Sequence, residues 1–229
     1  MELKHILLGV GFALIWASAF PSAKMAVQFC PPFLFLFLRF SSAGLFSILL
    51  GAYLGQSLKF DRKSLLWIAT FGLIQNGLYL GLIFLALTKI DANVSVIIAS
   101  ILPLTVAFFS WIFFKAKISF LGLFGLVVGL AGVLLIMLQR VEKEIELLGI
   151  TLCLLGLLAT TFSTLIITKI KINKNNILIV VGLQMLAGSL FLLPLSYFFE
   201  IWSFSFNVTF LFTFIYIAAF PGIIGPVIW

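Results

Sequence analysis

Two cations lie among apolar residues where a membrane interior is expected. Between Phe20 and Phe40, Lys24 and Arg39 are surrounded by aromatic and aliphatic side chains. A charge at bilayer depth costs about 2.5–3.5 kcal/mol even on the lenient insertion scale, so each cation needs water, a partner or a function. Such a cation can pair with a carboxylate or phosphate group. The pair therefore favours a site for an anionic or zwitterionic small molecule.

For both cations a structural role competes with the binding role. Arg39 lies about six residues, or roughly 9 Å, into its helix. A side chain there can snorkel outward to the headgroups or face an internal cavity, and the sequence does not separate these two interpretations. Lys24 lies near the far end of the preceding helix, where an interfacial anchor is favoured over a substrate contact.

Uncharged polar or aromatic residues at mid-membrane height complete the candidate site. Interhelical hydrogen bonding is the ordinary use of each Ser, Thr, Asn or Gln, but together they predict a polar cavity near the midplane. Pro103 predicts a kink in the fourth helix that frees the Ala99 carbonyl, with a packing role slightly favoured over binding. The candidate substrate-binding residues are Trp16, Arg39, Gln75, Asn76, Tyr79, Ser100, Pro103, Thr161 and Gln184.

Composition places the chain in a membrane. Hydrophobic residues make up 63% of the 229 residues, charged residues 9%, and the mean hydropathy is +1.30. Such values lie outside the usual range of soluble globular domains. The net charge of +7 does not indicate nucleic-acid binding, because the basic residues stand singly between apolar runs.

Eight apolar runs are long enough to span the hydrocarbon as helices. They lie near residues 6–25, 33–54, 65–87, 93–114, 118–138, 147–168, 177–199 and 208–229. With a cytoplasmic N-terminus, the inner ends collect most of the Lys and Arg residues, so the positive-inside rule favours that orientation. A cleavable signal peptide is a less favoured interpretation of the first run. In the fifth run, Gly122, Gly125, Gly129 and Gly132 line one face and predict close packing or a possible homodimer.

An internal repeat divides the chain into residues 1–140, with five helices, and 141–229, with three. Leu7-Leu8-Gly9 recurs as Leu147-Leu148-Gly149, and the Arg39 segment resembles the segment that begins at Gln184. Because each unit has an odd number of spans, the second copy is expected to be inverted. It supplies three helices where the first has five, so we expect a truncated second repeat and ten helices in the complete architecture.

The first repeat resembles the EamA-type permeases of the drug/metabolite transporter superfamily. The stretches that carry the resemblance are Trp16-Ala17-Ser18-Ala19-Phe20, Pro31-Pro32 followed by Leu38-Arg39-Phe40, Ala99-Ser100-Ile101-Leu102-Pro103-Leu104, and the glycine-rich segment 125–132. This resemblance implies inverted five-helix units around a central cavity. It also implies export or exchange of small metabolites across the cytoplasmic membrane, in which the chain would be a multi-pass protein.

The predicted function is therefore a secondary transporter that moves an anionic or zwitterionic solute, such as an amino acid, by alternating access. Every Asp and Glu lies at or near a span end, so exchange or facilitated efflux is favoured over proton antiport. An inactive or scaffold-type fragment of a permease is the alternative. A membrane-embedded enzyme is disfavoured, because no catalytic cluster occurs at membrane depth, and we expect no metal and no cofactor.

Overall fold

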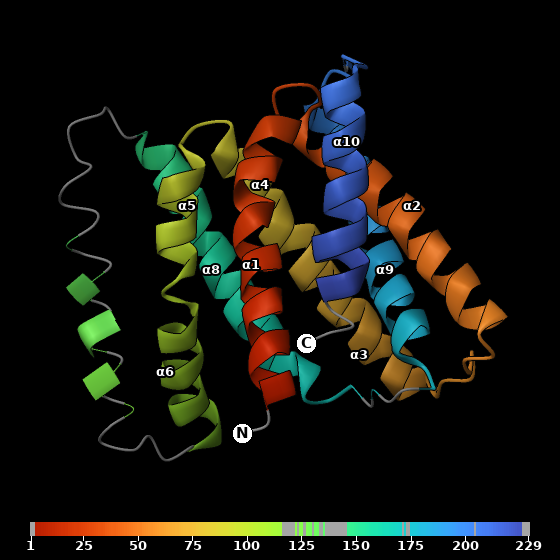
Figure 1. The fold of residues 1–229 in the computed structure, drawn as a ribbon, viewed down its shortest axis with the longest axis horizontal. Helices are drawn as coiled ribbons and strands as arrows, with labels where there is room; N and C mark the ends of the chain where they lie inside the picture. The colour runs from red at the N-terminus through yellow and green to blue at the C-terminus, as the bar shows by residue number, and fades with distance from the viewer. Residues whose placement is uncertain are drawn as a thin grey trace.

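The computed structural model describes residues 3–115, 122, 124–125, 127–129, 131–132, 135, 146–170, 172, 175–203 and 205–225. These residues form helices that stand side by side (Figure 1). In chain order the elements are α1 (Leu3–Ala26), α2 (Pro32–Tyr53), α3 (Arg62–Gly72), the π-helical segment η1 (Leu73–Tyr79), α4 (Leu80–Leu87), α5 (Ala92–Ala99), α6 (Leu102–Phe114), α8 (Leu147–Ile167), α9 (Ile177–Phe199), α10 (Val208–Ile217) and the π-helical segment η2 (Ala218–Ile224).

Five of the described helices are long and apolar enough to cross a membrane. They are Pro32–Tyr53, Arg62–Leu87, Ala92–Phe114, Leu147–Ile167 and Ile177–Phe199, and Val208–Ile224 forms a shorter apolar helix. Together with α1, these elements match every predicted span except the fifth, because residues 118–138 lie largely outside the described part. The predicted class, an all-α polytopic membrane protein, is confirmed.

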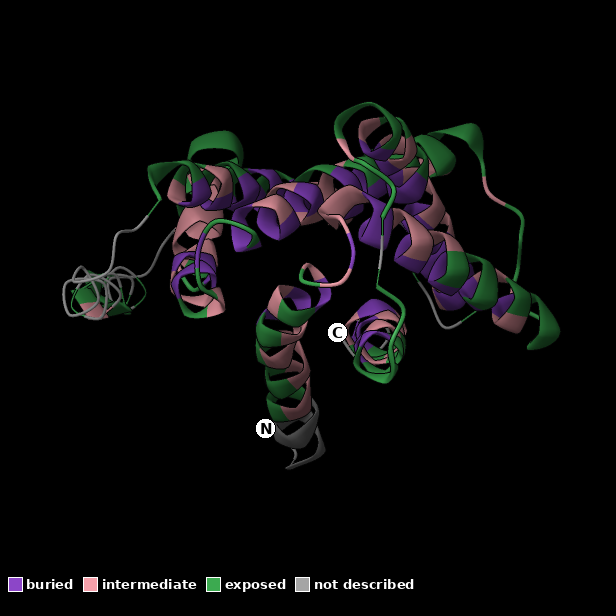
Figure 2. Cartoon of the chain, turned by 90° about the horizontal axis from the view of Figure 1, so that it is seen from above, coloured by how far each residue is buried: buried purple, intermediate pink, exposed green. Residues whose placement is uncertain are grey.

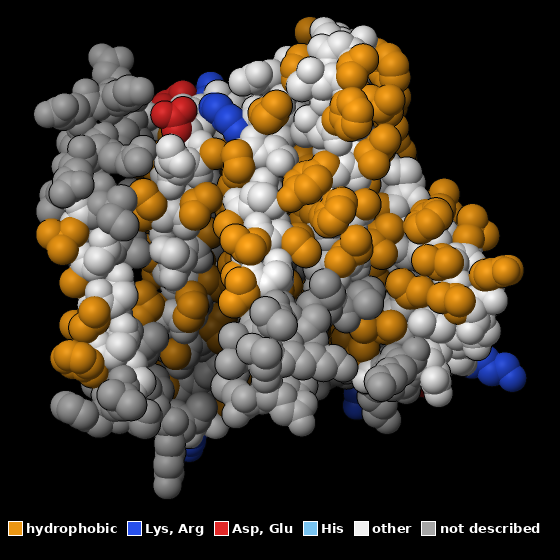
Figure 3. Space-filling view, in the orientation of Figure 1, with side chains coloured by type: hydrophobic (Ala, Val, Ile, Leu, Met, Phe, Trp, Pro, Cys, Tyr) orange, Lys and Arg blue, Asp and Glu red, His pale blue; other side chains and the backbone are white. Residues whose placement is uncertain are grey.

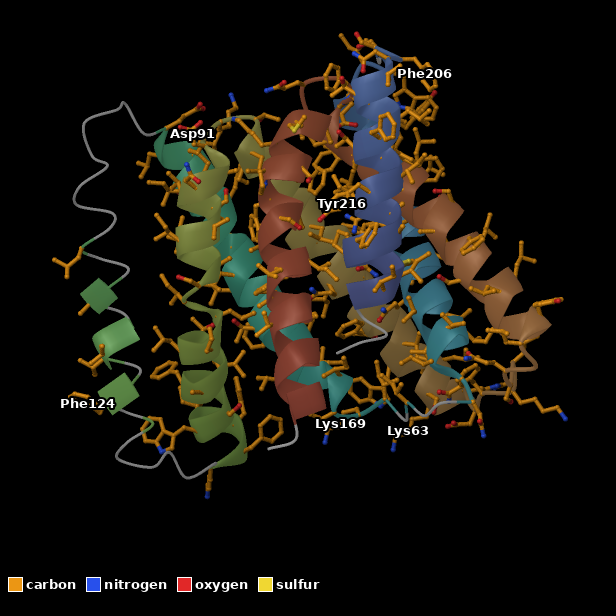
Figure 4. All side chains as sticks on the ribbon, in the orientation of Figure 1. Lys63, Asp91, Phe124, Lys169, Phe206 and Tyr216 are labelled. Carbon is orange, nitrogen blue, oxygen red and sulfur yellow. The ribbon has the colours of Figure 1, made fainter. Side chains whose placement is uncertain are left out.

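Apolar side chains cover the middle of the molecule, and charged side chains gather at its edges. Figure 3 shows hydrophobic side chains over the whole height of one face, with Lys, Arg, Asp and Glu near the top and bottom. Lys63 and Lys169 lie at one edge, and Asp91 lies at the opposite edge (Figure 4). The first two belong to the end that the sequence predicts to be cytoplasmic, an orientation that stays a prediction.

Most of the helices form a curved layer, and α1 and α10 stand in front of it. Seen from above, these two helices project from the concave side of the layer (Figure 2). The hydroxyl groups of Ser18 and Tyr216 form a hydrogen bond that links α1 to α10, and Tyr216 lies between the two helices in Figure 4. The space between the layer and this pair is therefore bounded on both sides.

Helices α2 and α9 form the most extensive helix pair of the described fold, and they run antiparallel. Gly44, in the middle of α2, lies against Gly182 and Leu186, whereas Gly51, near the end of α2, meets Ile179 at the start of α9. A Cβ atom added at Gly182 would lie 2.7 Å from the carbonyl oxygen of Gly44. Glycine is needed at this contact because the two backbones approach so closely.

At one end of this pair, a side chain from α9 caps α2. The Glu200 carboxylate, directly after α9, accepts hydrogen bonds from the backbone amides of Phe33 (2.7 Å) and Leu34 (2.8 Å). These amides belong to the first turn of α2, where no intrahelical acceptor exists. A carboxylate at that position also interacts favourably with the helix dipole.

The other end of the pair is capped in the reciprocal way. The Oε1 atom of Gln56, just after α2, accepts hydrogen bonds from the amides of Leu178 (2.9 Å) and Ile179 (3.4 Å) at the start of α9. Along the sequence, Phe33 and Leu178 are as far apart as Arg39 and Gln184, the residues that begin the two similar segments of the repeat. This reciprocity supports the predicted inverted repeat, whose division into residues 1–140 and 141–229 stays a prediction.

Irregular turns interrupt three of the described helical segments, which correspond to the third, fourth and eighth predicted spans. η1 and η2 are wide π-helical turns at positions that the predicted repeat makes equivalent. The fourth span is broken between α5 and α6 at Ser100 and Ile101, and Pro103 follows in the first turn of α6, in agreement with the kink that the proline predicts. π-helical turns occur frequently at functional sites, so these two segments point to the space that they border.

Three of the four glycines on the face predicted in the fifth span make no close contact with the described elements. Nothing lies within 4 Å of a Cβ atom added at Gly125, Gly129 or Gly132. Close helix packing through glycine occurs instead at Gly72, where an added Cβ would overlap the Gln184 carbonyl oxygen of α9. The possible homodimer stays a prediction.

Candidate functional site

A cavity of about 660 Å³ lies between the curved layer and the α1–α10 pair. Its described lining comes from α1, α2, η1, α8, α9 and η2, among other elements, so most of the fold contributes to it. The cavity is of the size that small-molecule sites commonly have. Among the predicted substrate-binding residues, six line it: Trp16, Arg39, Gln75, Asn76, Tyr79 and Gln184.

Arg39 lies inside the protein and not at its lipid-facing surface. Its side chain on α2 is 4% exposed, and the guanidinium carbon lies 4.7 Å from the centroid of the Phe40 ring. The Nε atom has no hydrogen-bond partner, and the described residues include no salt bridge to this arginine. A snorkelling arginine would keep its charged group exposed at the surface. The burial of Arg39 therefore favours the cavity interpretation.

The segment η1 brings three polar side chains to the cavity. The Gln75 Oε1 atom accepts hydrogen bonds from the hydroxyls of Thr160 (3.0 Å) and Ser163 on α8. Asn76 is 7% exposed, and its Nδ2 atom is buried without a hydrogen-bond partner. Tyr79 is 3% exposed at the end of the same segment.

Glycine contacts hold η1 against α9. A Cβ atom at Gly188 of α9 would lie 2.5 Å from the Cβ atom of Asn76 and 3.0 Å from the carbonyl oxygen of Gly72. Because Gly188 carries no side chain, the wide turn of η1 sits directly on α9. This packing fixes the position of Asn76 at the cavity wall.

α9 and η2 also line the cavity. Gln184 on α9 is 8% exposed and lines the cavity. A Cβ atom added at Gly222 of η2 would lie 3.7 Å from both the Nη2 atom of Arg39 and the Cε atom of Met185. The bare backbone at Gly222 therefore leaves room beside the guanidinium group.

The three remaining candidates do not line the cavity. Ser100 is exposed, and its hydroxyl donates to the Ile97 carbonyl (2.6 Å). Pro103 is also exposed. Thr161 is fully buried and donates to the Leu157 carbonyl (2.7 Å). The prediction that these residues bind substrate has no support from the geometry of the cavity.

Thr160 and Thr164 line the cavity instead. The sequence places both at mid-membrane height, but only their neighbour Thr161 was predicted to bind substrate. They lie four residues apart on α8 and share one helix face. Thr161 follows Thr160 by one residue, which turns its side chain by about 100° around the helix, and its hydroxyl lies 2.7 Å from that of Thr105 on α6. The spacing of Thr160 and Thr164 is the signal that could have found them.

Lys24 has a structural role. Its ammonium group donates to the carbonyl oxygens of Leu87 (2.6 Å) and Ile90 (2.9 Å), at the C-terminal end of α4. Unpaired carbonyls collect at that end of a helix, and a cation there interacts favourably with the dipole. Lys24 therefore joins α1 to α4, and it is absent from the described cavity lining.

The described residues contain no group of three or more His, Cys, Asp or Glu side chains that could hold a metal ion. Within the described lining, the polar side-chain groups are one guanidinium, amides, hydroxyls and the indole N–H of Trp16. Such groups can bind a polar or charged solute by hydrogen bonds and charge.

Comparison with known proteins agrees with this description. Residues 3–138 match the EamA-like transporter family. The chain is 25% identical over 180 residues to the uncharacterized transporter YvbV of Bacillus subtilis (strain 168). This alignment covers 79% of this chain and 58% of that relative. It is 28% identical over 228 residues to an uncharacterized transporter in the trpA 3' region of Buchnera aphidicola subsp. Schlechtendalia chinensis, covering 96% of this chain and 73% of that relative.

A solved crystal structure has the same fold. It superposes with a TM-score of 0.73 at 18% sequence identity and covers 100% of this chain and 78% of the other. The fold is thus that of a multi-pass membrane protein with an internal cavity. Because the family match extends over more than half of the sequence, the chain belongs to the EamA-like transporter family. The names of its relatives indicate transporters and not enzymes.

Proposed function

We propose that this chain moves a small anionic or zwitterionic solute across the cytoplasmic membrane by alternating access. The observation that carries the proposal is Arg39, a cation that is 4% exposed, lines the 660 Å³ cavity and has no acidic partner among the described residues. An intramembrane cation in a cavity is by default a functional residue. A solute with a carboxylate or phosphate group would supply the missing partner.

The helix arrangement supports the alternating-access part of the proposal. α2 and α9 are antiparallel and reciprocally capped, as expected for the central pair of an inverted repeat. The cavity lies beside this pair and is bordered by η1 and η2. Transporters with inverted repeats bind their solute at the interface of the two repeats and rock one against the other. We infer that η1 and η2 are the points at which the third and eighth helices bend.

A metabolite comparison tests the function without knowledge of the solute. Cells that express the wild-type chain, Arg39→Gln or Lys24→Gln at matched membrane levels are grown in the same medium, and anionic and zwitterionic metabolites are quantified inside and outside the cells. At least one such solute should change its distribution with the wild type and Lys24→Gln but not with Arg39→Gln. Identical profiles for wild type and Arg39→Gln would favour the non-transporting scaffold.

A further inference from the structure

The charges and hydrogen-bond donors of the cavity define a narrower class of solute. We propose that it selects a carboxylic acid with one negative charge and an apolar, preferably aromatic, tail over an amino acid with the same skeleton and over a dianion. The inference rests on the proposed function only in taking this cavity as the solute site.

The charge of the cavity matches one negative charge. Of the described residues that line it, Arg39 alone is charged, and none is Asp or Glu. A monoanion would leave the occupied cavity neutral, whereas a dianion would leave one negative charge without a partner. Because an unpaired charge is unfavourable beside mostly apolar walls, where it is screened less than in bulk water, the monoanion is the preferred occupant.

The fully buried side-chain atoms of the cavity lining that lack a hydrogen-bond partner are both donors. The Nε atom of Arg39 and the Nδ2 atom of Asn76 are both buried without a partner. The Oε1 atom of Gln75 already accepts two hydroxyl hydrogen bonds, from Thr160 and Ser163. Its two lone pairs are thereby used, and its amide nitrogen remains as a donor. An ionised carboxylate, which only accepts hydrogen bonds, complements this set.

An amino acid fits this cavity less well because of its ammonium group. The described lining offers that group only uncharged acceptors, such as the Gln184 amide and the Thr164 hydroxyl, and aromatic ring faces. A ring face attracts a cation, but less strongly than an ionised carboxylate at the same distance. The ammonium would therefore enter the cavity with incomplete compensation for its lost hydration.

Aromatic side chains provide the surface for the apolar tail. Phe12, Trp16 and Phe20 project from one side of α1, and the rings of Phe12 and Trp16 are stacked with their centroids 6.3 Å apart. Phe71 of α3 lines the cavity as well. Aromatic rings pack favourably against one another in offset or edge-to-face arrangements, so a phenyl tail matches this wall.

Three matched probes test the inference: 3-phenylpropanoate, L-phenylalanine and 3-phenylpropanamide. The first two differ by the ammonium group, and the first and third differ by the negative charge. Each is titrated by calorimetry into the purified wild-type chain and Arg39→Gln in lipid nanodiscs, with empty nanodiscs as the control for partitioning. We expect 3-phenylpropanoate to bind wild type at least about tenfold more tightly than either analogue. In Arg39→Gln the acid should lose its advantage over the amide.

Three outcomes would overturn the inference: binding of L-phenylalanine as tight as that of the acid, no binding of the acid, or an unchanged preference for the acid in Arg39→Gln. Flux of the same probes in proteoliposomes separates this inference from the proposed function. Binding of the acid without flux would refute the transport function and leave the binding preference intact. Flux that favours L-phenylalanine would support transport and refute the preference.

Discussion

The two cations of the first two helices occupy opposite situations. Lys24 of α1 is partly exposed and donates to two carbonyl oxygens at the end of α4. Arg39 of α2 is almost fully buried, yet its Nε atom has no acceptor and its side chain lines the cavity. Both lie in equally apolar sequence, so hydropathy alone does not separate them. The difference teaches that the hydrogen-bond partner, and not the apolar sequence around it, separates the cation that joins two helices from the cation that lines the cavity.

Cys30, in the turn between α1 and α2, is a buried ionisable group that is accommodated in a third way. Its thiol is 3% exposed, and burial, with a smaller contribution from the Glu200 carboxylate, raises the pKa of Cys30 to about 12. The thiol therefore stays neutral at physiological pH and requires no partner. A guanidinium group does not readily lose its proton in this way, which leaves Arg39 as the group that still needs a counter-ion.

Replacing Arg39 should have the largest effect on binding. Arg39→Gln removes the charge and its charge-assisted hydrogen bonds, which contribute about 1.5–3 kcal/mol, so affinity for a monocarboxylate should fall about 10- to 150-fold. Thermal unfolding of the variant should occur at or above the wild-type temperature, because an unpaired buried charge has been removed. A large loss of thermal stability would instead identify Arg39 as a structural residue.

The opposite pattern is expected for Lys24. Lys24→Met keeps the length of the side chain but removes both hydrogen bonds to α4, which should lower the free energy of unfolding by about 1–3 kcal/mol. Binding of the carboxylate should stay within about twofold of wild type, since Lys24 is not part of the described lining. Thermal unfolding and calorimetry on the same preparation measure both quantities, and a stable variant with lost binding would contradict the comparison.

Asn76 should give a smaller effect than Arg39. The Nδ2 atom is a neutral donor, and a neutral hydrogen bond contributes about 0.5–1.5 kcal/mol, so Asn76→Ala should weaken carboxylate binding about 2- to 12-fold. Ser100→Ala is the matched control, because Ser100 is exposed outside the described lining. Equal effects of the two variants would argue against a direct contact at Asn76.

Cys30 should show the smallest effect. Because its pKa is raised to about 12, the folded protein at pH 8 holds little thiolate at this position and should react with a maleimide far more slowly than a free thiol. Glu200→Gln removes only the smaller cause of the raised pKa, so the rate should increase modestly. Fast labelling of Cys30 in the folded wild type would contradict its buried, neutral state.

The sequence predicted much of the fold, because membrane helices are encoded by local hydropathy. The positions of α2, α8 and α9 follow directly from the lengths of the apolar runs. The antiparallel α2–α9 pair agrees with the inverted repeat that the Arg39 and Gln184 segments suggested. The reciprocal caps could not be predicted, because Gln56 and Glu200 act on helices that are distant in the chain.

The candidate site was predicted in part. Asn76 and Gln184 could be found because polar groups at midplane height usually face the interior of a bundle. For Arg39 the sequence left snorkelling and the cavity open. Thr161 was chosen over its neighbour Thr160 because height in the membrane does not fix the rotation of a helix about its axis. The π-helical turns were also missed; η1 packs on α9 through glycine contacts between residues that are distant in the sequence.

The most direct test of the account asks whether position 39 faces water inside the protein. Arg39→Cys and, as a control three residues along α2, Ser42→Cys are introduced with Cys30 and Cys153 replaced by alanine. Ser42 is exposed on the helix and does not belong to the described lining, so it should face lipid. A charged, membrane-impermeant methanethiosulfonate reagent should modify Arg39→Cys and leave Ser42→Cys unmodified. Modification of Ser42→Cys but not of Arg39→Cys would contradict a water-accessible cavity at Arg39.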